Sequence, residues 1–158
     1  MYRYSRFDSP IGTLFVGYSE RGVSYLGDGR YLREFLKLHP EAKRDDKGAE
    51  PILKELEEYF GGSRRKFDVR LDLRGSDFQL KVWREISKIP YGETRSYGQL
   101  ARAMGMPKAY RAVGLACKAN RVLILVPCHR VVSARGLGGY SLGLWAKKKL
   151  LRLEGAKV

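Results

Sequence analysis

A cysteine and a histidine stand side by side in the stretch Ile124–Val132, ILVPCHRVV. The thiolate form of cysteine is the nucleophile, and a nearby base or cation brings the pKa of the thiol toward the working pH. Adjacent side chains of a regular strand point to opposite faces, so His129 can assist Cys128 only if the backbone bends, which Pro127 favours. The pair indicates either a nucleophile with its base or a thiol that packs in the core.

A general base of this kind needs a third group to orient it. Glu93 is the last acidic residue before Cys128, and Glu154 is the only one after it. Glu154 falls at the C-terminal end of an expected helix, where the helix dipole disfavours a negative charge by up to about 1 kcal/mol. Two interpretations stay open: a carboxylate that pairs with His129, or a frayed and exposed helix end.

The remaining cysteine and histidine do not extend this group. Cys117 fits the inward face of an expected helix, and His39 is isolated in a polar loop. The two cysteines are 11 positions apart, and the chain has no Cys-x-x-Cys or His-x-x-x-His pair. Reduced thiols are therefore expected, with neither a metal site nor a cofactor.

Charge is distributed unevenly along the 158 residues, whose net charge is +14. Residues 1–60 carry 10 Lys and Arg against 11 Asp and Glu, whereas residues 61–158 carry 21 against 6. A basic half joined to a neutral half indicates a polyanionic partner such as nucleic acid. A heat-adapted surface is the alternative, and the single Asn and two Gln fit a thermophile, but that explanation leaves the asymmetry unexplained.

The first part of the chain predicts a β-rich domain. Short strand-like runs at 13–18 and 22–26 are separated by a turn-forming stretch, Glu20–Gly22, which predicts a hairpin. Helices are expected over 31–38 and 51–60, the latter with Pro51 at its start. A polar loop at 40–50 and a further strand at 66–73 complete this part.

The second part predicts mostly helices. Two capping boxes, Ser76-x-x-Gln79 and Ser96-x-x-Gln99, mark helices that run to about Pro90 and Met104. Further helices are expected over about 107–119 and 144–154, and a glycine-rich loop over 136–141. The apolar run Val122–Val126 predicts an extended segment that is buried on both faces.

The helices on either side of Gly105 have the form of a helix-turn-helix. Five small side chains of the second helix are expected to face inward: Ala109, Ala112, Val113, Ala116 and Cys117. The opposite face mixes basic and apolar side chains, namely Lys108, Arg111, Leu115 and Lys118. Such a face could enter a DNA groove, or it could simply be the solvated side of an amphipathic helix.

PCHRVV followed by GLGGYSLG resembles the O6-alkylguanine-DNA alkyltransferases, which are direct-reversal repair proteins. SPIGTLFVG, FQLKVWREISKIPYGETRSYGQLA and RAVGLACKAN extend the resemblance over most of the chain. It implies an α/β (α+β) fold with a ribonuclease H-like domain at 1–74. It also implies a mostly helical DNA-binding and alkyl-acceptor domain at 75–158, with a helix-turn-helix of winged-helix type.

The resemblance also implies the reaction. An alkyl group would pass irreversibly from O6-alkylguanine in duplex DNA to Cys128 after base flipping, once per molecule, with O4-alkylthymine as a further candidate substrate. The partner would be double-stranded DNA and the protein a monomer. With no apolar run long enough to span a membrane and no signal-like N-terminus, a cytoplasmic protein is expected.

Roles follow from the matching motif positions. His129, oriented by Glu154, would accept the proton of Cys128 through a water. Tyr97 would help rotate the phosphate and donate a hydrogen bond to the base, Arg111 would enter the base stack, and Asn120 would brace the turn behind the site. The remaining implied contacts to base or DNA are the backbone of Val131 and the residues Gly139, Tyr140, Ser141, Lys108, Leu115, Lys118, Arg121 and Arg130.

Two features keep other functions in view. Arg121 stands where the family usually has proline, which adds a charge and changes the local turn. A helix-turn-helix protein that senses lesions without repairing them is one alternative, although such relatives lack the cysteine. A Cys-His hydrolase with true turnover is another, and it fits the basic half of the chain poorly.

Overall fold

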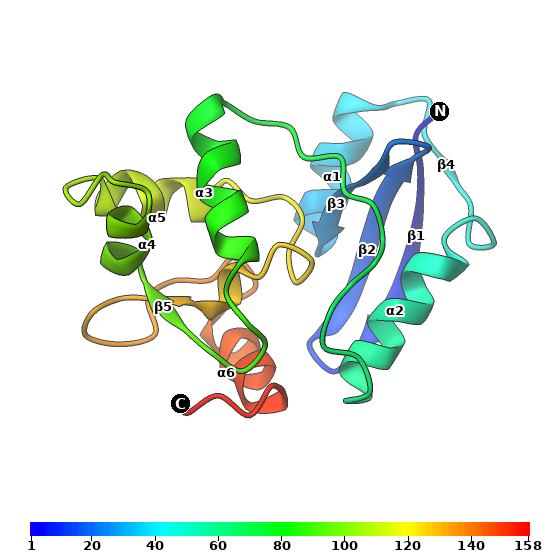
Figure 1. Ribbon diagram of the computed structural model, residues 1–158. Helices are drawn as coiled ribbons and strands as arrows, with labels where there is room; N and C mark the ends of the chain where they lie inside the picture. The colour runs from blue at the N-terminus through cyan, green and yellow to red at the C-terminus, as the bar shows by residue number, and fades with distance from the viewer. The chain divides into compact units, whose positions relative to one another are not determined.

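Four strands form the sheet of the N-terminal unit, Met1–Leu73, in the computed structural model, which describes residues 1–158 (Figure 1). The strands are β1 (Arg3–Ser9), β2 (Gly12–Ser19), β3 (Gly22–Gly27) and β4 (Lys43–Arg44). They lie in the order β3-β2-β1-β4, with β1, β2 and β3 antiparallel and β4 parallel to β1. The hairpin predicted around residues 20–22 is the β2–β3 pair.

Two helices complete this unit, α1 (Gly29–Leu38) and α2 (Glu50–Phe60), and both were predicted from the sequence. Helix α1 packs on β2 and β3, with Phe35 fully buried beneath it. Gly17 of β2 permits this contact, because a Cβ at that position would lie 2.6 Å from the Phe35 ring. The sheet and its helices thus enclose one apolar core.

The strand predicted at 66–73 is wrong, and the strands β1 and β4 were missed. Only one isolated bridge, Val23 with Leu71, joins this stretch to the sheet. Its backbone N–H groups at Asp68 and Val69 instead donate to the Glu55 carboxylate, at 2.7 and 3.3 Å. A side chain therefore satisfies the groups that a neighbouring strand would have paired.

The second unit, Arg74–Val158, is mostly helical. Its helices α4 (Tyr97–Ala103) and α5 (Tyr110–Lys118) pack together at one end, and α6 (Leu144–Leu153) lies at the other. The short parallel pair of β5 (Arg95–Ser96) and β6 (Val131–Val132) lies between them (Figure 1). No helix of the protein combines the length and apolar character needed to cross a bilayer. In chain order the elements are α3 (Asp77–Ser87), β5 (Arg95–Ser96), α4 (Tyr97–Ala103), α5 (Tyr110–Lys118), the 3-10 helix η1 (Cys128–Arg130), β6 (Val131–Val132) and α6 (Leu144–Leu153).

Both capping boxes are present. The backbone N–H of Gln79 donates to Ser76 Oγ at 3.1 Å, while the Gln79 side chain accepts from the Ser76 N–H at 3.0 Å. Ser96 and Gln99 repeat this arrangement at 3.1 and 2.8 Å. Each box satisfies two backbone donors that a helix start would otherwise leave without partners.

Helix α5 begins three residues later than predicted, because residues 107–109 form a turn that leads into it. Val113, Ala116 and Cys117 face the core as expected. Ala112 is exposed, so its expected inward position is wrong. It lies about 100° around the helix from Val113, which places it outside the buried arc.

We expect Ser76→Ala to lower the free energy of unfolding by about 1 kcal/mol, since the N3 backbone donor of α3 loses its acceptor. Urea denaturation followed by circular dichroism measures the change. Ser87→Ala is the matched control in the same helix: its Oγ donates to the Trp83 carbonyl at 2.8 Å. Such back-bonding adds little, so that variant should stay within about 0.5 kcal/mol of the parent. Equal losses in both variants would contradict the assigned role of the cap.

Candidate active site

A tight reversal of the chain leads into the cysteine. The run Val122–Val126 is buried, as predicted, but it is not extended: the Val126 N–H donates to the Val122 carbonyl at 3.0 Å. Ile124 takes a left-handed conformation with φ of 72°, which is unfavourable for a β-branched residue by about 1–3 kcal/mol. Surrounding contacts must therefore hold the turn.

Asn120 provides those contacts. Its Oδ1 accepts from the Val122 N–H at 2.9 Å, and its Nδ2 donates to the Val126 carbonyl at 3.1 Å. The same Nδ2 lies 3.3 Å from Cys128 Sγ as a donor. One buried amide thus braces both ends of the turn and contacts the sulfur.

Cys128, His129 and Arg130 form the 3-10 helix η1, which starts after Pro127. The bend that allows adjacent residues to act together is therefore present. All three side chains are buried. His129 points to Glu154, with 2.8 Å between Nε2 and Oε2.

The Glu154 carboxylate is hydrogen-bonded to several groups of this region. Arg130 donates to it twice, from Nε to Oε1 at 2.8 Å and from Nη2 to Oε2 at 3.0 Å, and the Gly92 N–H donates to Oε1 at 3.2 Å. Gly92 has φ of 82°, and a Cβ there would lie 2.8 Å from the Glu154 carbonyl oxygen. Glu154 is only 6% exposed, so the interpretation as a frayed end is wrong.

The hydrogen bond to Glu154 selects the tautomer of the neutral His129 imidazole. Burial lowers the pKa of His129, although the bond to Glu154 acts in the opposite direction. A neutral imidazole that donates from Nε2 to the carboxylate carries its lone pair on Nδ1. Nδ1 is buried and has no protein partner, so it is free to accept a proton.

Burial raises the pKa of the Cys128 thiol to about 11, while the Asn120 hydrogen bond and the Lys147 charge act to lower it. The thiol is therefore protonated at neutral pH. A reaction at sulfur has to remove this proton as it proceeds, and the adjacent residue His129 carries a buried Nδ1 without a hydrogen-bond partner.

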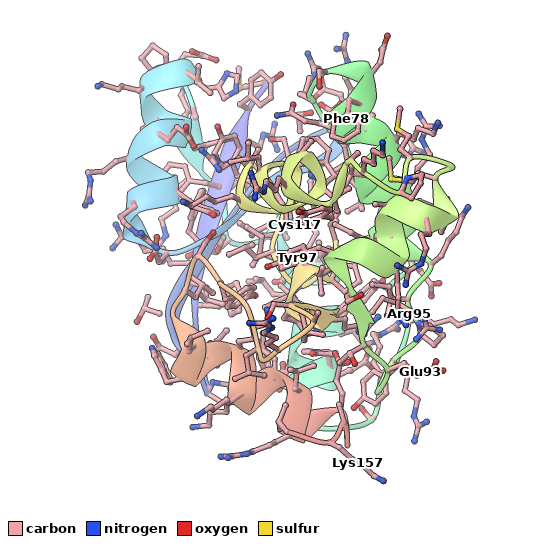
Figure 2. The ribbon with its side chains drawn as sticks, turned by 90° about the vertical axis from the view of Figure 1, so that its left-hand side faces the viewer. Phe78, Glu93, Arg95, Tyr97, Cys117 and Lys157 are labelled. Carbon is pink, nitrogen blue, oxygen red and sulfur yellow. The ribbon has the colours of Figure 1, made fainter.

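A pocket of about 320 Å³ opens beside the sulfur. Figure 2 shows Tyr97, at the start of α4, and Cys117, on α5, close together in the middle of this unit. The loop residue Gly138 has φ of 71°, and a Cβ there would lie 2.8 Å from the Tyr97 hydroxyl, so the loop approaches α4 closely. The lining residues are Tyr97, Gly114, Cys117, Lys118, Cys128, Gly139, Tyr140 and Ser141.

The remaining predicted residues fall into two groups. Lys108, Arg111, Leu115 and Lys118 are exposed on α5 and the turn before it, with Leu115 at 68%. Arg121 is half-buried and donates to the Lys118 carbonyl at 3.3 Å. These five side chains form an outward surface next to the pocket.

Arg130 does not belong to that surface, so its prediction as a DNA contact is wrong. Besides its two bonds to Glu154, it donates from Nη1 to the Ile89 carbonyl at 2.8 Å, and its guanidinium lies 5.8 Å from the Tyr91 ring centroid. A guanidinium enclosed in this way has no face left for a phosphate. Its neighbours in the fold, rather than its charge, determine its role.

Sequence reasoning missed Lys147. Its side chain is fully buried, and its ammonium donates to the carbonyl oxygens of Val131 at 2.6 Å and Gly139 at 2.9 Å. Lys147 stands in a run of three lysines at 147–149, a pattern that is typical of a solvated helix face. The spacing of Lys147 with the buried Leu150 and Leu151, at i+3 and i+4, was the available signal.

A small sheet with helices and a buried cysteine at a pocket define a mixed α/β protein with a potential nucleophile. Residues 77–156 match the family described as "6-O-methylguanine DNA methyltransferase, DNA binding domain". Proteins named methylated-DNA–protein-cysteine methyltransferase from Methanosarcina acetivorans and Mycobacterium bovis are 42% and 45% identical. Their alignments cover 97% and 100% of this chain and 98% and 95% of the relatives.

Solved structures agree with the sequence comparison. Mycobacterium tuberculosis OGT in complex with DNA is 43% identical with a TM-score of 0.88, over 97% of this chain and 92% of that chain. Mycobacterium tuberculosis O6-methylguanine methyltransferase is 41% identical with a TM-score of 0.86, over 98% and 93%. The chain belongs to the methylated-DNA–protein-cysteine methyltransferase family.

We expect Glu154→Gln to lower the free energy of unfolding by about 3–5 kcal/mol, because the buried Arg130 charge loses its counter-ion. Urea denaturation measures the loss. Glu93→Gln is the matched control: Glu93 pairs with Arg95 at 3.0 Å on the surface, where an ion pair contributes at most about 1 kcal/mol. A Glu154→Gln variant as stable as the control would show that the buried carboxylate is dispensable.

Proposed function

We propose that this protein repairs alkylated DNA by direct reversal, transferring the alkyl group of O6-alkylguanine to Cys128 once per molecule. Membership of the family supports the reaction, and the DNA complex of the Mycobacterium tuberculosis relative supports the partner. The observation that carries the proposal for these residues is the buried pair of Glu154 with His129, the residue directly after Cys128, together with the pocket that Cys128 lines. No cofactor takes part in this reaction.

The chemical step is a displacement at carbon. The Cys128 proton passes to His129 Nδ1 through a water, the sulfur forms a bond to the alkyl carbon, and the bond from that carbon to guanine O6 breaks. Guanine leaves as the anion and takes up one proton, and the step balances when the protonated His129 gives up the proton that it accepted from Cys128. Because a thioether is a stable product with no leaving group to restore the thiol, each molecule acts once.

The target base must leave the duplex to reach a buried sulfur. Gly139, Tyr140 and Ser141 line the pocket and are proposed to contact the flipped base. The Val131 carbonyl accepts from Lys147, yet a carbonyl oxygen has two lone pairs, so it can also accept from the base edge. Tyr97, at the pocket wall, is proposed to donate a hydrogen bond to the base and to help rotate its phosphate.

We propose different functions for the two structural units. We propose that residues 1–74 form a ribonuclease H-like domain and that residues 75–158 bind DNA and accept the alkyl group. Residues 74–158 carry 17 Lys and Arg against four acidic residues, one of which is the buried Glu154. Within them α4 and α5 would act as a helix-turn-helix of winged-helix type.

The outward surface beside the pocket is proposed to meet DNA. Arg111 would enter the base stack as the damaged base leaves, and Lys108, Leu115, Lys118 and Arg121 would contact backbone and groove. The exposure of α5 on this side supports the assignment, since Lys118 belongs both to this surface and to the pocket lining. DNA held on α5 would therefore place the flipped base over Cys128.

We expect duplex DNA containing O6-methylguanine to add one methyl group to each protein molecule, with no further increase in mass at higher DNA concentrations. Trypsin separates the two thiols, since Cys117 lies in peptide 112–118 and Cys128 in peptide 122–130, and peptide mass spectrometry should find the methyl only on the second. Cys128→Ala should remain unmodified. Methyl removal from DNA by Cys128→Ala would refute the reaction, and tight binding without a mass gain would indicate a lesion sensor.

We expect Arg111→Ala and Lys118→Ala to separate base flipping from phosphate binding. Lys118→Ala should weaken binding to all duplexes alike and reduce the slope of log K against log salt by about one unit, measured by fluorescence anisotropy. Arg111→Ala should reduce transfer from duplex DNA more than it reduces affinity. An unchanged salt slope for Lys118→Ala would remove this helix face from the phosphate contacts.

A further inference from the structure

Tyr110 is the first residue of α5, and its side chain is 48% exposed. Two cations stand close to it in the sequence, Lys108 and Arg111, and the Arg111 guanidinium lies 5.8 Å from the centroid of its ring. An exposed aromatic ring among cations suits a nucleic acid, because the ring offers a flat face to a base while the cations attract the phosphates.

The position of Tyr110 on α5 relates it to the pocket. Gly114 and Cys117, which line the pocket, follow four and seven residues later on the same helix. At 3.6 residues per turn these two positions lie within about 40° of the direction of Tyr110, one on each side of it. Since helical side chains lean toward the N-terminus, the Tyr110 ring stands about one turn beyond the pocket lining.

This row of α5 leads from the solvent into the protein. Exposure falls along it from Tyr110 at 48%, through the half-buried Gly114, to Cys117 at 9%. A Cβ at Gly114 would lie 3.9 Å from the Tyr97 ring, so the glycine leaves space there that a side chain would fill. At the inner end of the row Cys128 also lines the pocket. A base that moves along α5 toward the sulfur therefore passes the Tyr110 ring first.

We propose that Tyr110 is a stacking residue for base flipping: its ring covers one face of the target base as that base leaves the duplex and moves toward Cys128. The inference rests on the proposed function, because it assigns a step within that reaction. A paired base has a neighbour on each face, and extrusion exposes both faces to water. Contact with Tyr110 replaces one of these neighbours, while Arg111 enters the place that the base leaves in the stack.

Tyr110→Ala tests the proposal in single-turnover transfer from duplex DNA that contains O6-methylguanine. The rate constant at saturating DNA should fall by about 10-fold, because the extruded base loses its stacking partner. Tyr110→Phe keeps the ring and should transfer at the parent rate, whereas Tyr110→Leu keeps apolar bulk without a ring and should be as slow as Tyr110→Ala. Trp145→Ala removes an exposed aromatic ring from α6 and is the control that should leave the rate unchanged.

A single-stranded substrate separates stacking during extrusion from a packing defect. In a single strand of the same sequence the O6-methylguanine has no pair to break, so less energy is needed to bring it out. The loss caused by Tyr110→Ala should therefore shrink to less than about 3-fold on the single strand. Equal losses on the duplex and the single strand would overturn the proposal, because a distorted pocket slows transfer from both. A parent rate on duplex DNA would overturn it as well.

The contact with Arg111 provides the competing explanation, in which the ring acts only by holding the guanidinium in place. If Tyr110 stacks on the base itself, Tyr110→Ala should slow transfer from duplex DNA by a similar factor in the parent and in Arg111→Ala. No further loss in the Arg111→Ala background would overturn the proposal and assign the ring to the arginine. Methyl transfer by the unaltered protein shows separately whether the proposed function holds.

Discussion

The buried carboxylate of Glu154 is the interaction on which the rest of the site depends. It lies at the C-terminal cap of α6, where the helix dipole opposes a negative charge, and burial adds a desolvation penalty. Two bonds from Arg130, one from the Gly92 backbone and one from His129 offset these costs. The same contacts join the last helix, the turn before β5 and the 3-10 helix that contains Cys128, so the interaction that holds these segments together also orients the His129 imidazole.

The reactive sulfur is held in a protonated and shielded state. Burial raises the pKa of the Cys128 thiol to about 11. The Asn120 amide donates to the sulfur and holds the strained turn at Ile124 that precedes it in the chain. An unshielded thiolate would react with any small electrophile, and a residue that is used once cannot be restored. Under the proposed mechanism, deprotonation that is coupled to the neighbouring His129 would restrict the reaction to the bound substrate.

Local signals in the sequence predicted most of the helical framework. The boxes at Ser76 and Ser96 and the turn before Gly22 were read correctly because each depends on residues within a few positions of one another. The strand expected at 66–73 failed because Glu55, distant in sequence, takes its backbone donors. The run Val122–Val126 was correctly predicted to be buried, but its apolar character did not reveal the reversal at Ile124, which Asn120 holds from outside the run.

The sequence by itself determined the types of groups available: one Cys-His pair, one later carboxylate, and a basic half suited to DNA. Only the tertiary structure decided how they are used. It turned Arg130, which was expected to contact DNA, inward to a counter-ion 24 positions away, and it buried Lys147 against two carbonyls. The physical reason is that the environment of a charge depends on what packs around it, and contacts between distant segments set that environment, whereas spacing along the chain reports only local neighbours.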